Sequence, residues 1–215
     1  MKIVTALLMF AGLGFQDTPQ EIPKSELPKK APCVVCSAGG NEHGEEKAAA
    51  GVRYKGKTFY FCAAGEVEGF KKDPESFMPP VLPRPALSLE LKTLEGGKAT
   101  LTDYKGKVVL VDFWGTWCGP CVKTIPELQK LHTKYADKGF TVLGAAVGDT
   151  VPKVRDFVKK RKVTYPMLMD DSGWKKWGVR AVPAMFLVDK TGQIVRQWTG
   201  VPDKKEVEKA VVDFL

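Results

Sequence analysis

Cys118 and Cys121 are separated by two residues, and their position in the chain favours redox chemistry. The apolar, β-branched run 108–114 predicts a buried strand before them, and apolar residues at helical spacing over 122–135 predict a helix after them. The N–H groups and dipole of a helix N-terminus stabilise an anion and lower the pKa of a thiol placed there. We therefore expect Cys118 to be the attacking thiol in disulfide exchange and Cys121 the resolving thiol.

Two other uses of this cysteine pair are a structural disulfide and half of a zinc site. Zinc needs further ligands nearby, and the chain after Cys121 contains no cysteine and one histidine, His132. A disulfide that closes so short a loop constrains the unfolded chain little. The order of strand, CxxC and helix instead indicates a redox-active dithiol.

The composition is that of a globular protein, with 44% hydrophobic and 27% charged residues in a chain of 215. This length allows one sizeable core, or one domain with a small module. The formal charge of +8 suits an acidic protein partner or proximity to an anionic membrane, but a solvated lysine-rich surface explains it better than either. Nucleic acid is not expected as a partner, because no recognition motif accompanies the charge.

The N-terminus predicts export. Residues 1–15 contain Lys2 followed by an apolar run that is typical of a signal peptide, although an uncleaved anchor or a buried N-terminal element would have a similar sequence. Export would place the protein outside the cytoplasm, in the periplasm or secreted, where thiols are not kept reduced by default. Residues 16–32 contain four prolines among polar residues and predict an extended linker.

Residues 33–78 predict a small separate module with its own cysteines. The pair Cys33 and Cys36 precedes a Gly- and Glu-rich loop, and a hairpin over 52–62 then delivers Cys62. So short a segment buries little core and commonly needs a metal or a disulfide. Cysteine is a soft ligand that favours zinc or copper. We expect three cysteine ligands, with the fourth supplied by one of two residues: His43 or Glu66.

The alternative for this module is a Cys33–Cys36 disulfide with Cys62 buried. The segment resembles the YHS/TRASH-like metal-binding modules, on the residues Cys33, Cys36, 54–62 and 70–77. In that family a further cysteine usually follows the hairpin cysteine by four positions, where this chain has Glu66. The resemblance implies a heavy-metal site, and the departure at Glu66 implies a harder or weaker site, or one that has lost its metal.

Residues 79–85 contain four prolines and predict a stiff spacer between this module and the rest. From residue 86 to residue 215 strands and helices alternate. Strands are expected at 87–94, 99–101, 108–114, 140–147, 165–169, 184–188 and 193–198, and helices at 119–137, 151–160, 173–177 and 203–215. The fold class is therefore α/β, a mixed sheet with helices on both faces, plus the small N-terminal hairpin and helix module.

Residues 86–215 resemble the thioredoxin superfamily, and in particular the exported thiol-disulfide reductases of the TlpA/ResA type. The segments that carry the resemblance are 101–107, 112–121, Val182-Pro183 and 187–195. The resemblance implies a cis peptide bond at Pro183, and backbone at Val182 that pairs with an incoming substrate strand. An ordinary trans proline at the start of an edge strand is the alternative.

The resemblance also identifies Asp112 with the buried acid of cytoplasmic thioredoxins. A carboxyl group buried in a strand has a raised pKa and is suited to take the proton of Cys121. TlpA/ResA-type proteins more often have a neutral residue at the position of Asp112, and a Glu at the position of Thr124. Trp117 lies at the rim of the dithiol, where packing and substrate contact explain it equally well.

The sequence predicts an extracytoplasmic thiol-disulfide oxidoreductase that acts on protein disulfides. In relatives the dipeptide Gly119-Pro120 accompanies reducing proteins, so we expect a reductase. No flavin or nicotinamide fingerprint occurs, so no organic cofactor is expected and an external dithiol protein must supply electrons. The alternative is a zinc or copper chaperone or sensor whose dithiol keeps the cysteines of a client's metal site reduced. A peroxidase is disfavoured, because its attacking cysteine usually follows a Thr or Ser by three residues, where Gly115 stands.

Overall fold

The computed structural model describes residues 18–38, 45–78 and 80–215. The expected signal segment 1–15 and His43 lie outside these ranges, so both stay predictions. The chain divides into two compact units, one built mainly from residues up to 77 and one that contains 80–215. Within the described ranges, no helix combines the length and apolar character that crossing a membrane requires.

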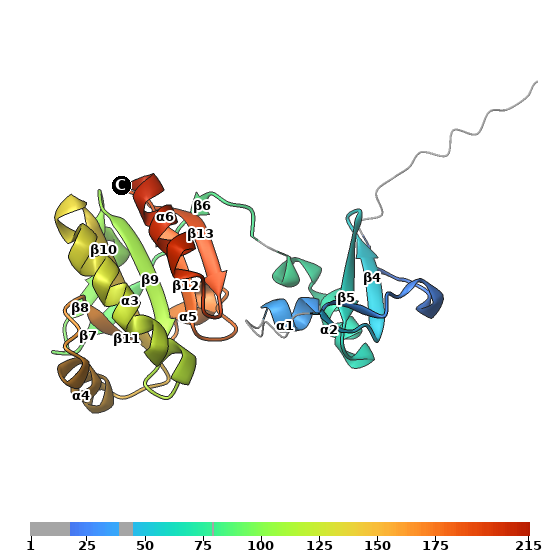
Figure 1. Ribbon diagram of the computed structural model, residues 1–215, viewed down its shortest axis with the longest axis horizontal. Helices are drawn as coiled ribbons and strands as arrows, with labels where there is room; N and C mark the ends of the chain where they lie inside the picture. The colour runs from blue at the N-terminus through green and yellow to red at the C-terminus, as the bar shows by residue number, and fades with distance from the viewer. Residues whose placement is uncertain (1–17, 39–44, 79) are drawn as a thin grey trace, which may run out of the picture. The chain divides into compact units, whose positions relative to one another are not determined.

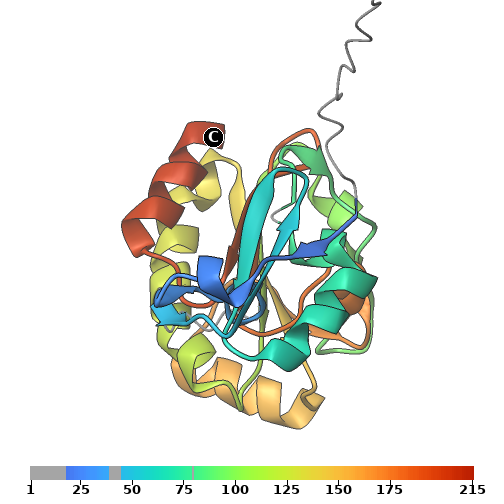
Figure 2. The ribbon, with the colours of Figure 1, turned by 90° about the vertical axis from the view of Figure 1, so that its right-hand side faces the viewer.

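An antiparallel hairpin forms the centre of the N-terminal unit (Figure 2). Strands β4 (Ala50–Tyr54) and β5 (Lys57–Phe61) pair across a two-residue turn in which Lys55 and Gly56 have φ of 45° and 72°. Positive φ at both turn residues matches the right-handed twist of the strands. Helix α2 (Val67–Lys72) follows and buries Phe70 completely. The ring of Phe70 contacts four other aromatic rings: Tyr54, Phe59, Phe61 and Phe77.

The prediction of an extended linker over residues 16–32 was wrong for much of this segment. It contains β1 (Gln20–Glu21), the 3-10 helix η1 (Lys24–Glu26) and β2 (Lys30–Pro32). Strand β1 pairs with β4, and β2 pairs with β3 (Glu45–Lys47). The side chains of Ile22 and Leu27 pack directly over Gly51. The linker prediction followed the prolines, but edge strands tolerate proline, and the pairing partners lie elsewhere in the sequence.

The helix α1 (Val34–Ala38) and the 3-10 helices η2 (Ala64–Glu66) and η3 (Pro74–Phe77) complete the described elements of residues 18–78. The predicted hairpin and helix are therefore present. Cys33 lies just after β2, Cys36 within α1, and Cys62 just after β5. The hairpin and its flanking helical turns thus bring together cysteines that are far apart in the chain.

In the described residues 80–215, eight strands form one sheet (Figure 1). In spatial order they are β6 (Arg84–Pro85), β13 (Gln193–Thr199), β12 (Ala184–Val188), β9 (Val108–Trp114), β10 (Phe140–Val147), β11 (Met167–Asp170), β7 (Glu90–Thr93) and β8 (Lys98–Thr100). The central strands β9, β10 and β11 run parallel, and the other neighbours are antiparallel. Parallel neighbours need a crossover connection, which α3 (Gly119–Tyr135) and α4 (Val151–Arg161) supply.

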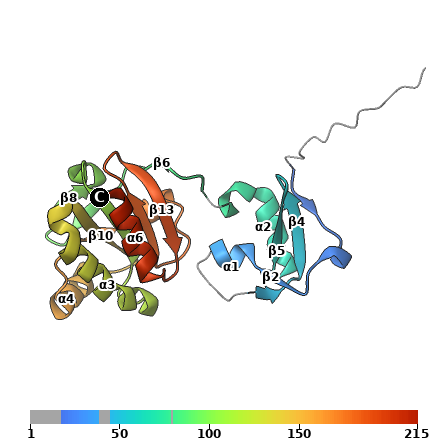
Figure 3. The same ribbon diagram turned by 45° about the horizontal axis from the view of Figure 1, so that its top comes forward.

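The two faces of the sheet are covered unequally. Helices α3, α4 and α6 (Lys204–Phe214) share one core with β9, and Figures 1 and 3 show α3 and α6 on the same side of the sheet. The other face is covered by the short helix α5 (Gly173–Lys176) and the 3-10 helix η4 (Leu101–Tyr104). Another 3-10 helix, η5 (Ala136–Lys138), follows α3. The expected mixed sheet with helices on both faces is confirmed, with most helical cover on the side of α3.

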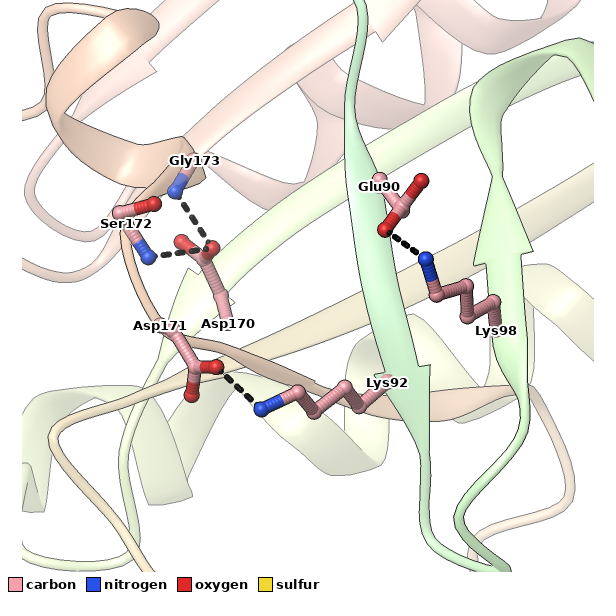
Figure 4. A network of polar contacts seen from close by, with 7 residues as sticks. All are labelled: Glu90, Lys92, Lys98, Asp170, Asp171, Ser172 and Gly173. Carbon is pink, nitrogen blue, oxygen red and sulfur yellow. Dashed lines mark hydrogen bonds and ion pairs between the residues drawn. The ribbon is translucent and has the colours of Figure 1, made fainter.

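Polar contacts hold the β7–β8 edge and the start of α5 (Figure 4). The carboxylate of Asp170 accepts hydrogen bonds from three successive backbone N–H groups, those of residues 172–174. Exposed ion pairs join Lys92 to Asp171 and Lys98 to Glu90. Exposed pairs contribute about 1 kcal/mol or less each, so the buried Asp170 is the more important anchor of this corner.

The predicted spacer 79–85 also differs from the structure at its end. Arg84 and Pro85 form β6, which pairs with β13 at Gln193 and Ile194. Proline cannot donate to a ladder but is tolerated on an edge strand. This short strand covers part of the otherwise open edge of β13, which limits edge-to-edge association.

Candidate active site at the Cys118–Cys121 dithiol

Cys118 and Cys121 form a disulfide at the start of α3. Their Cα atoms are 5.3 Å apart. Cys118 is the N-cap of the helix, and the backbone N–H of Cys121 donates to its Sγ atom at 3.2 Å. Cys118 is 5% exposed and Cys121 is completely buried. Within the pair, only Cys118 is thus open to solvent, and it lies where helix N–H groups stabilise a thiolate.

The loop before the dithiol is tied to the end of β10. Trp117 is 61% exposed, yet its Nε1–H donates to the carbonyl of Val147 at 3.0 Å. The N–H of Thr116 donates to the Asp149 carboxylate at 2.7 Å. A Cβ at Gly115 would lie 2.6 Å from Trp117 Nε1, so only glycine lets the indole lie over this backbone. No sequence pattern marks Asp149 for this role, because a single acid in a loop carries no periodicity or motif.

The segment before β12 lies against the dithiol. The peptide bond between Val182 and Pro183 is cis, as the resemblance implied. The Sγ of Cys118 lies 3.7 Å from the carbonyl oxygen of Val182. Gly119 and Pro120 are exposed beside it. The structure therefore gathers all the predicted substrate-contact residues around Cys118.

Asp112 lies in β9 and is completely buried. Its side chain points to the same face as Leu110 and Trp114, which share a core with Cys121. Among the described residues, neither carboxylate oxygen has a hydrogen-bond partner. Burial raises the pKa of Asp112 to about 7, because a charge is poorly solvated in the core. A carboxyl group with this pKa can gain or lose a proton near neutral pH.

The three N-terminal cysteines also cluster. The Sγ atoms of Cys33, Cys36 and Cys62 all lie within 4.8 Å of one another. The Glu66 Oε2 atom lies 3.7 Å from Cys33 Sγ and 3.8 Å from Cys62 Sγ. Of the two residues considered as the fourth ligand, Glu66 is therefore at the cluster, while His43 is not described. In a tetrahedral site with metal–sulfur distances of about 2.3 Å, ligand atoms are separated by similar spacings, so this donor set fits a metal.

Comparison with known proteins identifies the family of the C-terminal unit. Residues 83–197 match the model of the AhpC/TSA family, more than half of the chain. This range includes Asp112, both dithiol cysteines and Pro183. The chain belongs to the AhpC/TSA family. The match does not include residues 33–78, so the resemblance of that segment to YHS/TRASH-like modules stays a prediction.

Individual relatives point to the same chemistry. The chain is 35% identical over 144 residues to "Thiol-disulfide oxidoreductase ResA" of Bacillus anthracis, which covers 66% of this chain and 81% of the relative. Among solved structures, a putative thiol:disulfide interchange protein DsbE from Chlorobium tepidum is 28% identical with a TM-score of 0.57, and covers 61% of this chain and 95% of that one. A putative thioredoxin from Neisseria meningitidis is 27% identical with a TM-score of 0.54, and covers 60% and 87%. The α/β fold of this AhpC/TSA member is thus thioredoxin-like.

Proposed function

We propose that this chain, a thioredoxin-like thiol-disulfide oxidoreductase, reduces protein disulfides outside the cytoplasm through Cys118 and Cys121. The observation that carries this proposal is the position of the two sulfurs. Cys118 lies at the helix N-terminus beside the Val182 carbonyl, and Cys121 is buried behind it. One thiol is therefore placed to meet a client and the other to resolve the product. Disulfide exchange needs no organic cofactor, because the sulfurs themselves exchange the electrons.

The reaction proceeds in two exchanges. The Cys118 thiolate attacks a client disulfide, which forms a mixed disulfide and releases one client thiolate. Cys121 then loses its proton to Asp112 and attacks the Cys118 sulfur, which releases the second client thiolate and leaves the Cys118–Cys121 disulfide. The client gains two electrons and the dithiol loses two. An external dithiol protein returns them by the same exchange in reverse.

The backbone next to Pro183 suits an extended client segment. Val182 is half-buried and places its carbonyl beside Cys118, where strand-like pairing holds the client sulfur near the nucleophile. The exposed Trp117, Gly119 and Pro120 form the rest of this surface. Main-chain pairing recognises an extended segment without selecting its sequence, which suits a reductase with several clients.

A trapping experiment tests the assignment of the two thiols. In Cys121→Ser the mixed disulfide cannot be resolved, so a disulfide-linked client complex should accumulate and disappear with dithiothreitol. Cys118→Ser is the control and should form no such complex. Trapping through Cys118→Ser, with none through Cys121→Ser, would reverse the assignment of the attacking thiol.

The reducing direction rests on the Gly119-Pro120 dipeptide and is tested by equilibrium with glutathione. We expect a reduction potential below about −200 mV, in the range of thioredoxin and the glutaredoxins. A potential near −120 mV, typical of a strong oxidant, would contradict the reductase.

Export, proposed from the segment 1–15, is tested by cell fractionation and N-terminal sequencing of the mature protein. Cytoplasmic recovery with Met1 intact would contradict it.

We further propose that the N-terminal cluster binds a metal, with Cys33, Cys36, Cys62 and Glu66 as ligands and zinc or copper as the ion. The donor atoms of these four residues lie together, and Phe61, next to Cys62 in the chain, packs on the buried Phe70. Isothermal titration with Zn²⁺ and Cu⁺ should give one ion per chain, and Cys62→Ser should abolish binding. Equal binding by Cys62→Ser would contradict this site. The relatives reported above carry names of redox proteins, so the chaperone or sensor alternative gains nothing from them.

A further inference from the structure

Several buried polar atoms behind the dithiol have no protein partner. Among the described residues these include both carboxylate oxygens of Asp112, the hydroxyl of Tyr165 and the Nδ1 atom of His132. Buried polar groups are usually hydrogen-bonded to protein or to ordered water, and unpartnered ones often have a catalytic use. All three residues lie on the α3 side of the sheet.

Hydrogen bonds of its two chain neighbours, Thr164 and Pro166, hold the backbone at Tyr165 between α3 and the strands. On the helix side, the Gln129 side chain bonds to both the hydroxyl and the N–H of Thr164, at 2.7 and 2.8 Å. On the sheet side, the carbonyl of Pro166 accepts from the N–H of Gly144 at 2.9 Å. Gly144 is the register partner of Asp112. Tyr165 is therefore positioned on both sides and is 2% exposed.

The electrostatics link Tyr165 to Asp112. Burial raises the pKa of Tyr165 well above its usual value, and the negative charge of Asp112 raises it further. The hydroxyl therefore keeps its proton throughout the physiological range and can both donate and accept. Burial causes the raised pKa of Asp112. Within the described structure, no nearby cation stabilises its charged carboxylate form.

His132, in α3, packs against Tyr165. The two rings are edge to face with centroids 5.9 Å apart. The side chain of His132 is partly exposed, although its Nδ1 atom is buried. Burial lowers its pKa, and the positive charge of Lys107 lowers it further. A neutral imidazole results, and its buried nitrogen can accept a proton that the exposed part of the ring returns to water.

We propose that Tyr165 and His132 form a proton path that carries the Asp112 proton away from the dithiol. The inference rests on the proposed function, in which Asp112 takes the proton of Cys121 while a client covers Cys118. Neither the Asp112 carboxylate nor His132 Nδ1 is hydrogen-bonded to the Tyr165 hydroxyl in the described structure, so a bridging water completes each link: Asp112 donates toward the Tyr165 oxygen as the Tyr165 proton passes toward His132 Nδ1. His132 then releases one proton to solvent. Asp112 returns to its carboxylate form and Tyr165 to its neutral hydroxyl, while His132 is left as a neutral imidazole with its proton on Nδ1; exchange of the ring protons with solvent then restores the accepting tautomer.

This path gives the Asp112 proton a route to solvent that does not pass the dithiol. Cys121 and Asp112 are completely buried, and a bound client closes the Cys118 side. Helix α3 advances about 1.5 Å per residue, so His132 lies three helical turns away from Cys121. Proton release at His132 therefore does not require the client to leave. Tyr165 affects the reacting sulfurs only through Asp112, so it is a positioning residue and not a catalytic one.

Stopped-flow reduction of a fluorescent disulfide peptide by the reduced full-length protein tests the path. The first phase reports attack by Cys118 and the second reports resolution by Cys121, each measured from pH 6 to 9 in H₂O and D₂O. Tyr165→Phe and His132→Gln should slow the second phase about tenfold, below the full effect of a general base, and change its pH profile and isotope effect. The first phase should not change.

Tyr135→Phe is the matched control. The side chain of Tyr135 is also buried, but its hydroxyl donates to Glu208, so both phases should match those of the unaltered protein. Superimposable second-phase profiles for Tyr165→Phe, His132→Gln and the unaltered protein would overturn the path. If Asp112→Asn slows the second phase while these two variants do not, only the path fails. If Asp112→Asn has no effect, the assignment of Asp112 under the proposed function fails as well.

Discussion

The Sγ atom of Cys118 lies 3.7 Å from the carbonyl oxygen of Val182, 64 residues away in the chain. The two residues meet at one end of two paired antiparallel strands: Cys118 follows the end of β9, and Val182 precedes the start of β12, where Ala184 is the register partner of Phe113. Hydrogen bonding between these two strands therefore sets the distance between the nucleophile and the backbone to which a client segment pairs.

Gly115→Ala should weaken client binding without changing the reactivity of the dithiol. The added methyl group would lie 2.6 Å from Trp117 Nε1 and would displace the indole from the Val147 carbonyl. We expect KM for a disulfide peptide to rise about tenfold, since losing one ordered contact costs roughly 1 to 1.5 kcal/mol. Alkylation of Cys118 by iodoacetamide should keep its rate. Gly65→Ala, which adds a methyl group in open space, is the control, and an unchanged KM in Gly115→Ala would contradict the prediction.

Asp112 should make the protein less stable as the pH rises. The ordinary pKa of 3.8 is raised to about 7 in the folded state, so the folded protein binds the proton more tightly than the unfolded chain does. The stability that this provides is fully present below pH 4 and is lost as the pH rises through about 7. At 1.36 kcal/mol per pKa unit the loss is on the order of 4 kcal/mol.

Asp112→Asn should remove this dependence. Guanidinium unfolding of the oxidised protein should show the variant to be more stable than the unaltered protein at pH 8 and similar to it at pH 4. Asp203→Asn, which alters an exposed helix N-cap, serves as a control for a general charge effect. Parallel stability curves for Asp112→Asn and the unaltered protein would show that Asp112 does not titrate in this range.

Gly51→Val should destabilise the N-terminal unit. A Cβ at this position would lie 2.7 Å from Ile22 and 3.1 Å from Leu27, so a larger side chain forces the segment 20–27 off the hairpin. Overpacking of this kind costs roughly 1 to 3 kcal/mol. The measurement is limited proteolysis, in which cleavage within 20–32 should become faster while the C-terminal unit stays intact. Cleavage at the rate of the unaltered protein would mean that this segment does not pack on Gly51.

Glu66→Gln should weaken metal binding more than Glu68→Gln does. Glu66 contacts the sulfurs of Cys33 and Cys62, whereas Glu68 is exposed and pairs with Lys71. Replacing a carboxylate ligand by an amide removes a charge and should raise the Kd for Zn²⁺ by about tenfold or more, since even partners of ligands contribute that much. Equal affinities in a competition titration with a zinc chelator would exclude Glu66 as a ligand.

The sequence predicted the elements whose signal is local. The buried strands over 108–114, 140–147 and 184–188 have the predicted bounds, because each is a largely apolar run between turn residues. The dithiol at the start of a helix follows from the same local pattern. Asp203 is the N-cap of α6 and accepts two backbone N–H groups, as its residue type favours at that position.

Other features depend on partners that are distant in the chain, and only the tertiary structure decided them. The segment 16–32 has the composition of a linker, but β1 is a strand because β4 lies beside it. Tyr165 has the residue type of an ordinary core aromatic, and only its place between Gln129 and the register partner of Asp112 makes it a candidate for proton transfer. Hydrophobic periodicity records which face of an element is buried; it does not record which residue of another element that face will meet.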